Sequence, residues 1–338
     1  MTRSPRKLLI VTPKFHGYWR SIENAFMALG YDVRSHRYDD VSAGDKVYNK
    51  VRHELPAKIR GTGQHLSREQ TTDRAIDVLR ETRPGLLLVV RGDALTDRFW
   101  QAVADARIPA GIWFYDELTK MDQDLPQLAD RARIASYSAA DVRQLVSQGI
   151  PALHVPLAFD PGITVRHRPY DATISFIGAR YPKREALLHG LVERGLPVRA
   201  YGRDWSDHPV DRLRTWRTSS IGVPNGRDLP LAEGYGVMHG SAATLNIHGA
   251  QDGFTMRTFE ACGVGAVQLI DRSDVADLYE PGTEILVFKN EDELTELCRK
   301  CLADTPEMRR LREQGRRRTL DSHTFRHRAH DLEALWAE

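Results

Sequence analysis

The feature that most constrains this chain is a repeated alternation of short, β-rich apolar runs with segments whose apolar residues recur at helical spacing. Such alternation is typical of βαβ units, which right-handed crossovers join into a parallel, doubly wound sheet. In the first half, strands are expected at residues 8–11, 31–33, 86–90, 111–115 and 134–137, and helices at 20–29, 71–82, 97–106 and 139–148.

The second half repeats the pattern, so a second sheet of the same kind is expected. Strands are predicted at residues 172–177, 198–201, 243–247, 266–270 and 285–288, and helices at 184–194, 255–262, 273–279, 292–302, 307–320 and 325–336.

The 338 residues suit two domains, since a domain averages about 150 residues. Four prolines between Pro151 and Pro169 separate the two alternating halves and indicate a linker. We therefore expect domains at 1–155 and 171–320 with a linker at 156–170, and a cleft between the domains. Ligands of such sheets bind outside the carboxyl ends of the strands, so residues that directly follow strands are the informative ones.

Bulk composition excludes several classes of protein. The formal net charge of +2 gives no electrostatic case for a nucleic-acid binder. The three cysteines are too few for a disulfide framework, and the pair Cys298 and Cys301 lies in a helical pattern without further metal ligands nearby. No apolar run reaches the length of a membrane span. A cytoplasmic protein is expected, and peripheral contact with a membrane stays open.

The first candidate binding segment is FIGARYPKR, which follows the first strand of the second half. Gly178 permits close approach of a ligand to the backbone, and the helix that begins near Lys183 directs its first amides at the same place. Arg180, Lys183 and Arg184 add positive charge, which together suits a pyrophosphate. A solvated basic helix start is an equally weighted alternative.

The second candidate segment is YGRDW, where a strand ends at Gly202 and Trp205 follows. This turn could face a nucleobase. A turn glycine beside a packed tryptophan explains the same residues at least as well.

The third segment, NIHGAQDGFTMRTFEACG, is the most specific of the three. A strand ends near Asn246, a glycine-containing loop follows, and a helix opens near Thr255, so loop amides can hold phosphate oxygens. Arg257 in the first helical turn opposes the helix dipole and calls for an anionic partner. The Glu260 carboxylate can accept two ribose hydroxyls, and a buried Arg257–Glu260 ion pair is the alternative.

These segments resemble those of GT-B glycosyltransferases, in particular the CgeB-like (spore maturation protein) branch near glycosyltransferase group 1. DGFTMRTFEACGVGA is similar to that family's R-x-F-E-A helix and to the E-x7-E element of retaining enzymes, with Asp252 in place of the first glutamate. FIGARYPKR resembles the donor-phosphate loop, YGRDW the Y-G-x-x-W turn, and residues 323–335 the last helix.

The resemblance implies an α/β, GT-B fold with two Rossmann-like domains and a C-terminal helix at 321–338 that packs back on the first domain. It also implies a hexosyltransferase-like enzyme with a nucleotide-sugar donor bound mainly by the second domain, no required metal, and retention of configuration. The donor-binding residues expected on this basis are Gly178, Arg184, Gly202, Trp205, Asn246, Asp252, Gly253, Phe254, Thr255, Arg257 and Glu260.

Glycosyl transfer also requires stabilisation of the departing diphosphate and contact with the acceptor. Without a metal, Arg180 and Lys183 are expected to supply the first, with the loop amides. For the acceptor side, Asp116 follows a buried strand and His16 lies in the loop after the first strand, so either can serve as a base. A helix cap for Asp116 and an ordinary loop histidine for His16 remain alternatives.

Two other functions fit the same pattern. A non-hydrolysing UDP-sugar epimerase shares the two-domain fold and needs no acceptor. A protein that binds nucleotide sugars without turnover, within an assembly, is the other alternative. The acceptor itself, whether a natural product, a glycan or a cell-envelope component, is open.

Overall fold

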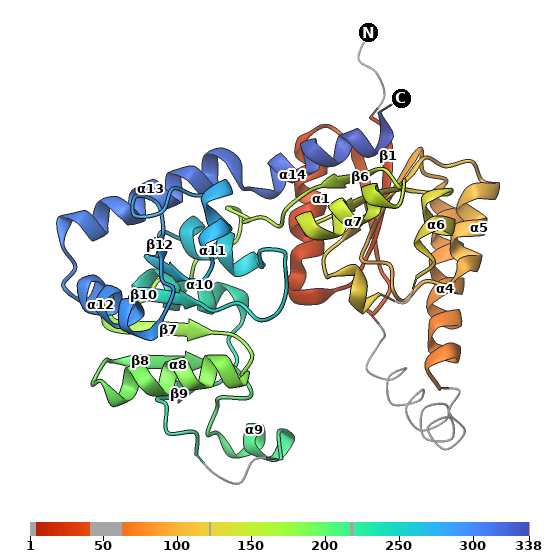
Figure 1. The fold of residues 1–338 in the computed structure, drawn as a ribbon. Helices are drawn as coiled ribbons and strands as arrows, with labels where there is room; N and C mark the ends of the chain where they lie inside the picture. Colours follow the sequence, from red (N-terminus) through yellow and green to blue (C-terminus); the bar gives the residue numbers. More distant parts are fainter. Residues whose placement is uncertain (1–4, 41–62, 122, 217–219, 338) are drawn as a thin grey trace. The chain divides into compact units, whose positions relative to one another are not determined.

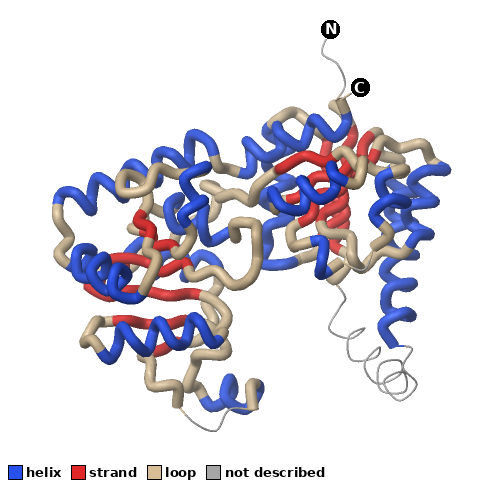
Figure 2. The backbone as a smooth tube through the Cα atoms, in the orientation of Figure 1, coloured by secondary structure: helices blue, strands red, loops and turns tan. Residues whose placement is uncertain are grey.

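The computed structural model describes residues 5–40, 63–121, 123–216 and 220–337 (Figure 1). The chain forms two compact units, of which unit 1 comprises Met1–Leu157 with Phe325–Glu338 and unit 2 comprises Ala158–Thr324. Each unit has a parallel sheet of six strands flanked by helices (Figure 2). The predicted α/β class with two doubly wound sheets is confirmed.

The sheet of unit 1 has the order β2-β1-β3-β4-β5-β6. Its strands are β1 (Lys7–Thr12), β2 (Asp32–Arg37), β3 (Leu86–Val90), β4 (Ala110–Phe114), β5 (Arg133–Ser136) and β6 (Ala152–His154). The helices are η1 (Phe15–Gly17), α1 (Tyr18–Ala28), α4 (Gly63–Thr82), α5 (Asp97–Asp105), η3 (Leu118–Lys120), α6 (Leu125–Ala129), α7 (Ala139–Ser147), α14 (Phe325–Leu332) and η5 (Glu333–Trp336).

Strands β3 and β4 are buried along their whole length, because helices cover both faces of this sheet. On one face, Leu87 and Ile112 pack with residues of α4 and α5, among them Phe99. On the other face, Leu335 of η5 lies so close to Gly111 that a Cβ there would be 2.7 Å from its side chain. The C-terminal segment of the chain is therefore part of the core of unit 1.

The sheet of unit 2 has the order β12-β11-β10-β7-β8-β9. Its strands are β7 (Asp171–Ile177), β8 (Val198–Tyr201), β9 (Asn225–Gly226), β10 (Ser241–Asn246), β11 (Gln268–Ile270) and β12 (Leu286–Val287). The helices are α8 (Pro182–Glu193), α9 (Pro209–Arg214), α10 (Leu231–Gly240), α11 (Met256–Gly263), η4 (Ser273–Asp277), α12 (Glu291–Leu302) and α13 (Pro306–Ser322).

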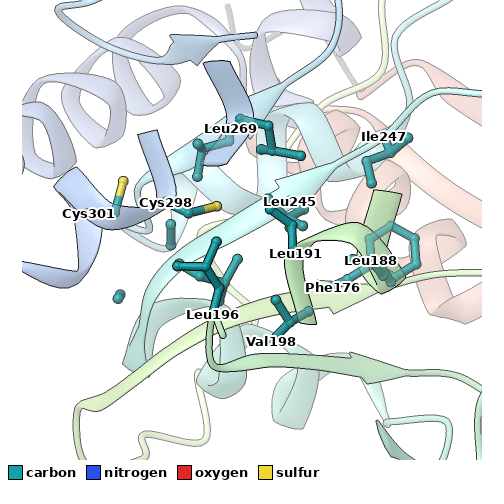
Figure 3. Close-up of a cluster of buried hydrophobic side chains, with 14 of the residues drawn as sticks. Phe176, Leu188, Leu191, Leu196, Val198, Leu245, Ile247, Leu269, Cys298 and Cys301 are labelled. Atoms are coloured by element: carbon teal, nitrogen blue, oxygen red, sulfur yellow. The ribbon is translucent and has the colours of Figure 1, made fainter. Parts of the chain in front are cut away.

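A single apolar cluster joins the sheet of unit 2 to α8 and α12 (Figure 3). Phe176 and Leu245 contribute from the strands, and Leu188 comes from α8. Cys298 and Cys301 of α12 are buried in the same cluster, where burial raises the pKa of the Cys301 thiol to about 12. These two cysteines are core residues, and no metal-binding cluster of His, Cys, Asp or Glu occurs among the residues that the structure describes.

The proline-containing segment 158–170, expected as a linker, belongs to unit 2. It packs against α10, where the amide of Arg166 donates to the carbonyl of Ala232 at 3.0 Å. Gly236 of α10 permits this approach, since a Cβ there would lie 1.9 Å from the Arg166 carbonyl oxygen. None of the described helices is long and apolar enough to cross a bilayer.

Candidate functional site

The strand order of unit 2 indicates where a binding crevice is expected. Counted along the chain within the unit, the order is 3-2-1-4-5-6, so the winding direction reverses between β7 and its neighbour β10. At such a reversal the connections leave to opposite sides and open a crevice at the carboxyl ends of the two strands. The segments after β7 and β10 are the first and third candidate segments of the sequence.

The turns after β7 and β8 are packed against each other. The Gly178 amide donates to the Tyr201 carbonyl at 3.1 Å, and the Trp205 indole donates to the Gly178 carbonyl at 3.0 Å. Gly202 has a φ of 150°, and a Cβ there would lie 2.7 Å from the Gly178 oxygen. Trp205 is fully buried beside Phe176, so the packed-tryptophan alternative describes this turn, and its ring is not presented to a ligand.

Two of the three predicted diphosphate cations are paired with carboxylates in this structure. Arg180 contacts Glu185 at 3.0 Å, and Lys183 contacts Asp271 at 2.5 Å. Both cations could reach an anion only by exchanging these partners.

Arg184 is different, because its hydrogen bonds go to backbone carbonyls. Its Nε donates to Ile247 at 2.8 Å and its Nη1 donates to Ala179 at 2.9 Å. It forms no ion pair with a carboxylate in the part of the chain that the structure describes. Burial lowers the pKa of this guanidinium, which remains charged at neutral pH. The result is a partly buried cation at the reversal point of the sheet, which the charge of Asp271 influences but which no described carboxylate pairs with directly.

The start of α11, in the third segment, provides further amide donors. Its N-cap, Thr255, makes no side-chain cap, and the first turn contains no acidic residue. The first amides of such a helix, together with the positive end of the helix dipole, favour an anion. Gly253 is buried just before it, and Phe254 and Asp252 are half-buried.

Asn246 fixes the strand end from which this loop departs. Its Nδ2 donates to the Thr258 hydroxyl at 2.9 Å and to the Gln268 side chain at 2.7 Å. Asn246 is buried and joins β10 to α11 and β11, so in this structure it positions the loop.

Arg257 and Glu260 form the ion pair that was the alternative to ribose binding. The distance from Arg257 Nη1 to Glu260 Oε2 is 3.0 Å, and the Glu260 side chain is only 1% exposed. Tyr235 donates to the other carboxylate oxygen of Glu260 at 3.1 Å. Contact with a ribose would require this pair to rearrange.

Two residues directly after β11, Asp271 and Arg272, complete the site and were missed at the level of sequence. The Arg272 guanidinium donates to the carbonyls of Gln251 and Asp252, and it stacks at 4.2 Å on the ring of Phe254. Arg272 thereby holds the loop before α11. The position of Arg272 directly after a strand is the sequence feature that could have identified it.

Asp271 accepts hydrogen bonds from His248, which lies in the third segment but was also not singled out. The His248 amide and Nδ1 are 2.9 and 3.1 Å from Asp271 Oδ1. Burial opposes ionisation of Asp271, but the hydrogen bonds from His248 and Lys183 prevail and lower its pKa to about 2. Asp271 is therefore a buried carboxylate ion.

A pocket of about 390 Å³ lies beside the start of α8 and is lined by Arg180, Tyr181, Pro182, Glu185, Asp204, Thr215 and Trp216. Two of its aromatic residues are strongly exposed, with Trp216 at 89% and Tyr181 at 53%. A wider hollow of about 780 Å³ near α12 is lined by charged residues of both signs. Its two arginines, Arg194 and Arg299, are paired with Asp292 and Glu296.

In unit 1, the two predicted acceptor-side residues have unlike surroundings. His16 is exposed in η1, with a φ of 47° and a ring contact to Phe15. Asp116 contacts Lys120 at 2.7 Å; despite partial burial, the hydrogen bond from Lys120 lowers the pKa of Asp116, which makes it a weaker base. Lys120 also contacts the buried Glu117, to which Tyr137 donates a hydrogen bond.

Structural comparison identifies the architecture. HepE from Anabaena, in complex with UDP-glucose, superposes with a TM-score of 0.63 at 11% identity, covering 98% of this chain and 99% of that chain. Sucrose-phosphate synthase from Thermosynechococcus elongatus superposes with a TM-score of 0.62 at 13% identity, covering 98% of each chain. The fold is GT-B.

A family model described as glycosyl transferase-like matches residues 182–334, which include α8 and the whole third segment. The sequence matches no curated protein. A protein described as a UDP-N-acetylglucosamine 2-epimerase, from Listeria monocytogenes, also superposes, with a TM-score of 0.56 at 11% identity and 91% coverage of each chain. The GT-B fold therefore does not by itself separate transfer from epimerisation.

Proposed function

We propose that this protein is a glycosyltransferase that moves a sugar from a nucleotide-diphosphate sugar to a hydroxyl of an acceptor. The observation that carries the proposal is the partly buried Arg184 guanidinium, which lacks a described carboxylate partner at the β7–β10 reversal. The glycosyl transferase-like match over residues 182–334 supports it, as does the fold shared with HepE, whose structure contains UDP-glucose.

The donor diphosphate is proposed to contact Arg184 and the amides from Gly253 to Thr255. Lys183 and Arg180 would join it by exchanging Asp271 and Glu185 for phosphate oxygens. Fixed donors of this kind stabilise charge that develops on a departing diphosphate. Glu260 is proposed to turn from Arg257 to the ribose hydroxyls.

The nucleobase is proposed to occupy the pocket beside α8, which the exposed side chains of Tyr181 and Trp216 line. The Arg184 guanidinium lies over the Tyr181 ring, 4.9 Å from its centroid. Aromatic side chains stack on bases of any sequence, so this pocket leaves the identity of the base open. The buried Trp205 would support the pocket from beneath by holding Gly178.

The resemblance to the CgeB-like branch supports two finer features of the proposed activity. These are hexosyl transfer without a required metal and retention of configuration at the transferred sugar. The three cysteines, Cys262, Cys298 and Cys301, are free thiols, which fits the cytoplasm as the proposed compartment. Asp116 is proposed to accept the proton of the acceptor hydroxyl after Lys120 has moved away from it. His16 is the second candidate for this role.

The test is thermal unfolding with UDP, GDP, dTDP or ADP, each with Mg²⁺ or with EDTA. A nucleotide at a hundredfold its dissociation constant stabilises by about 2.7 kcal/mol. We expect one nucleotide to stabilise the protein equally under both conditions, and Arg184→Ala to lose the effect. Arg199→Ala is the matched control, because Arg199 is an exposed arginine of β8. No stabilisation by any of the four nucleotides would refute the proposal.

Turnover separates the alternatives once the base is known. A transferase hydrolyses the glucose conjugate of the matching nucleoside diphosphate or transfers its glucose. NMR follows this reaction and gives the configuration of the product. An epimerase instead converts the nucleotide sugar without an acceptor, and a binding protein leaves it unchanged.

A further inference from the structure

Asp271 is shared between two basic side chains that differ in mobility. Lys183 contacts its Oδ2 at 2.5 Å, and His248 contacts its Oδ1 through the backbone amide and through Nδ1. The Lys183 side chain is 59% exposed, whereas those of Asp271 and His248 are 5% and 2% exposed. Lys183 can therefore swing away while the other two remain in place.

The second ring nitrogen of His248 is available for a proton. Nδ1 faces an ionised carboxylate, so in a neutral tautomer of the ring it is the nitrogen that carries the hydrogen. Nε2 is buried and forms no hydrogen bond with any residue that the structure describes. The ring edge packs on Phe254, with centroids 5.7 Å apart. Buried polar atoms without a partner are uncommon, and this one marks a group whose state can change.

The charges around His248 favour protonation of its ring when an anion binds nearby. Beyond Asp271, the charged groups described near His248 include Lys183 and Arg184 of α8, and Arg272 and Asp274 after β11. Arg272 is already paired with Asp274. If Lys183 turned to a diphosphate, Asp271 would be left as a buried carboxylate ion beside further negative charge, which is costly unless another cation replaces Lys183.

We propose that His248 takes up a proton from solvent when Lys183 leaves Asp271 to bind the donor diphosphate. The proton adds to Nε2, so the charge of the His248–Asp271 pair changes from −1 to zero and Lys183 is released for the phosphate. His248 is then a positioning residue that keeps Asp271 compensated. This inference rests on the proposed function, since it requires a diphosphate donor at the carboxyl end of β10.

The test is calorimetric titration of the full chain with a nucleotide glucose at one pH in two buffers without phosphate, PIPES and Tris, whose ionisation enthalpies differ widely. The ligands are UDP-, GDP-, dTDP- and ADP-glucose, which have no group of their own that titrates near neutral pH. We expect the enthalpy to depend on the buffer with the sign of proton uptake, up to one proton per site. Donor affinity then rises as the pH falls from 8.5 to 6.5, by at most about tenfold per pH unit.

His248→Gln keeps a donor for Asp271 but cannot be protonated, so its binding enthalpy should be the same in both buffers. His189→Gln is the matched control, because His189 is a partly exposed histidine of α8 beside Glu185, and it should retain the buffer dependence. If His248→Gln does not fold, the ¹⁵N resonances of His248 in the wild type, with and without ligand, report the same proton.

The outcomes separate this inference from the function on which it rests. Donor binding with equal enthalpy in both buffers, or with His248 resonances that the ligand leaves unchanged, would overturn proton uptake and leave the glycosyltransferase proposal standing. Failure of all four nucleotide sugars to bind would overturn both.

Discussion

The Nε–H of Arg184 donates to the carbonyl oxygen of Ile247 at 2.8 Å, which joins the start of α8 to the end of β10. These two segments are 63 residues apart in the chain and flank the reversal point of the unit 2 sheet. The same guanidinium also holds the Ala179 carbonyl at 2.9 Å. Its geometry is thus fixed before any ligand arrives, which lowers the cost of binding an anion.

Replacing Arg184 with lysine keeps the charge but removes the planar fork that holds the two carbonyls. Hydrogen bonds to a charged group contribute about 1.5–3 kcal/mol, so we expect the nucleotide dissociation constant to rise about 10- to 100-fold. Calorimetry on Arg184→Lys checks this, with Arg199→Lys as a control that should bind like the wild type. Equal affinity of both variants would contradict the assigned role of Arg184.

Arg272 is expected to govern the order of the loop before α11. In Arg272→Ala the carbonyls of Gln251 and Asp252 lose their donor and Phe254 loses its stacked cation. We predict faster amide hydrogen exchange at residues 251–255 and several-fold weaker donor binding. The control is Arg299→Ala, which removes an exposed pair with Glu296 on α12. Exchange rates that stay at wild-type values in that loop would rule out the holding role.

The sequence predicts ten of the twelve described strands, because short β-rich runs are a strong signal, but it misses the short edge strands β6 and β9. It does not predict α10, whose segment LAEGYGVMHG contains Gly234, Gly236 and Gly240 and is a poor helix former by propensity. The helix forms because the backbone at Arg166 packs directly on Gly236. That contact depends on tertiary structure, which local patterns do not contain.

In the candidate site, too, some features follow from local sequence patterns and others only from tertiary packing. Positions after strands direct attention to Arg184 and the third segment, which the structure places at the reversal point of the unit 2 sheet, but pairing between cations and carboxylates is set in three dimensions. Lys183 and Asp271 are 88 residues apart, so nothing local indicates that Asp271 neutralises a predicted phosphate-binding lysine. The burial of Trp205 against Gly178 is likewise set by tertiary packing, which the local sequence does not indicate.

Variants of the Arg257–Glu260 ion pair separate its contribution to the stability of the fold from its contribution to ligand binding. Because Glu260 is 1% exposed, Arg257→Ala leaves a buried carboxylate without its cation, and we expect a loss of about 3 kcal/mol in the free energy of unfolding. Urea denaturation measures this, and removal of the exposed pair Arg299–Glu296 should cost less than about 1 kcal/mol.

Glu260→Gln then tests ribose contact. If Glu260 binds the ribose, this variant should bind the matching nucleoside diphosphate more weakly but bind inorganic pyrophosphate with wild-type affinity. Calorimetry with the two ligands gives the comparison. A parallel loss for both ligands would assign Glu260 to the fold alone.

Asp271 makes a pH-dependent contribution to stability whose sign follows from its lowered pKa. The folded-state pKa is about 2 and the ordinary value is 3.8, so the ionised form stabilises the protein above pH 4 and this contribution disappears as the pH falls toward 2. The shift corresponds to about 2 kcal/mol at neutral pH. Urea unfolding should show Asp271→Asn less stable than wild type by about this amount at pH 7, with a smaller difference at pH 3. Asp321→Asn, at an exposed carboxylate, is the control; a constant difference across this range would contradict the assignment.

Gly202 is expected to tolerate no side chain, because the turn after β8 lies directly on the turn after β7. A Cβ at this position would lie 2.7 Å from the Gly178 oxygen, and the φ of 150° is itself unfavourable for alanine. The Gly178 carbonyl also accepts the Trp205 indole, so it cannot shift without breaking that hydrogen bond. We predict that Gly202→Ala lowers the free energy of unfolding by about 1–3 kcal/mol and weakens donor binding. Gly85→Ala is the control, since its Cβ would make an ordinary contact at 3.6 Å to Lys7. Wild-type stability of Gly202→Ala would contradict the close packing of the two turns, and unchanged donor binding would show that the pocket beside α8 does not depend on their contact.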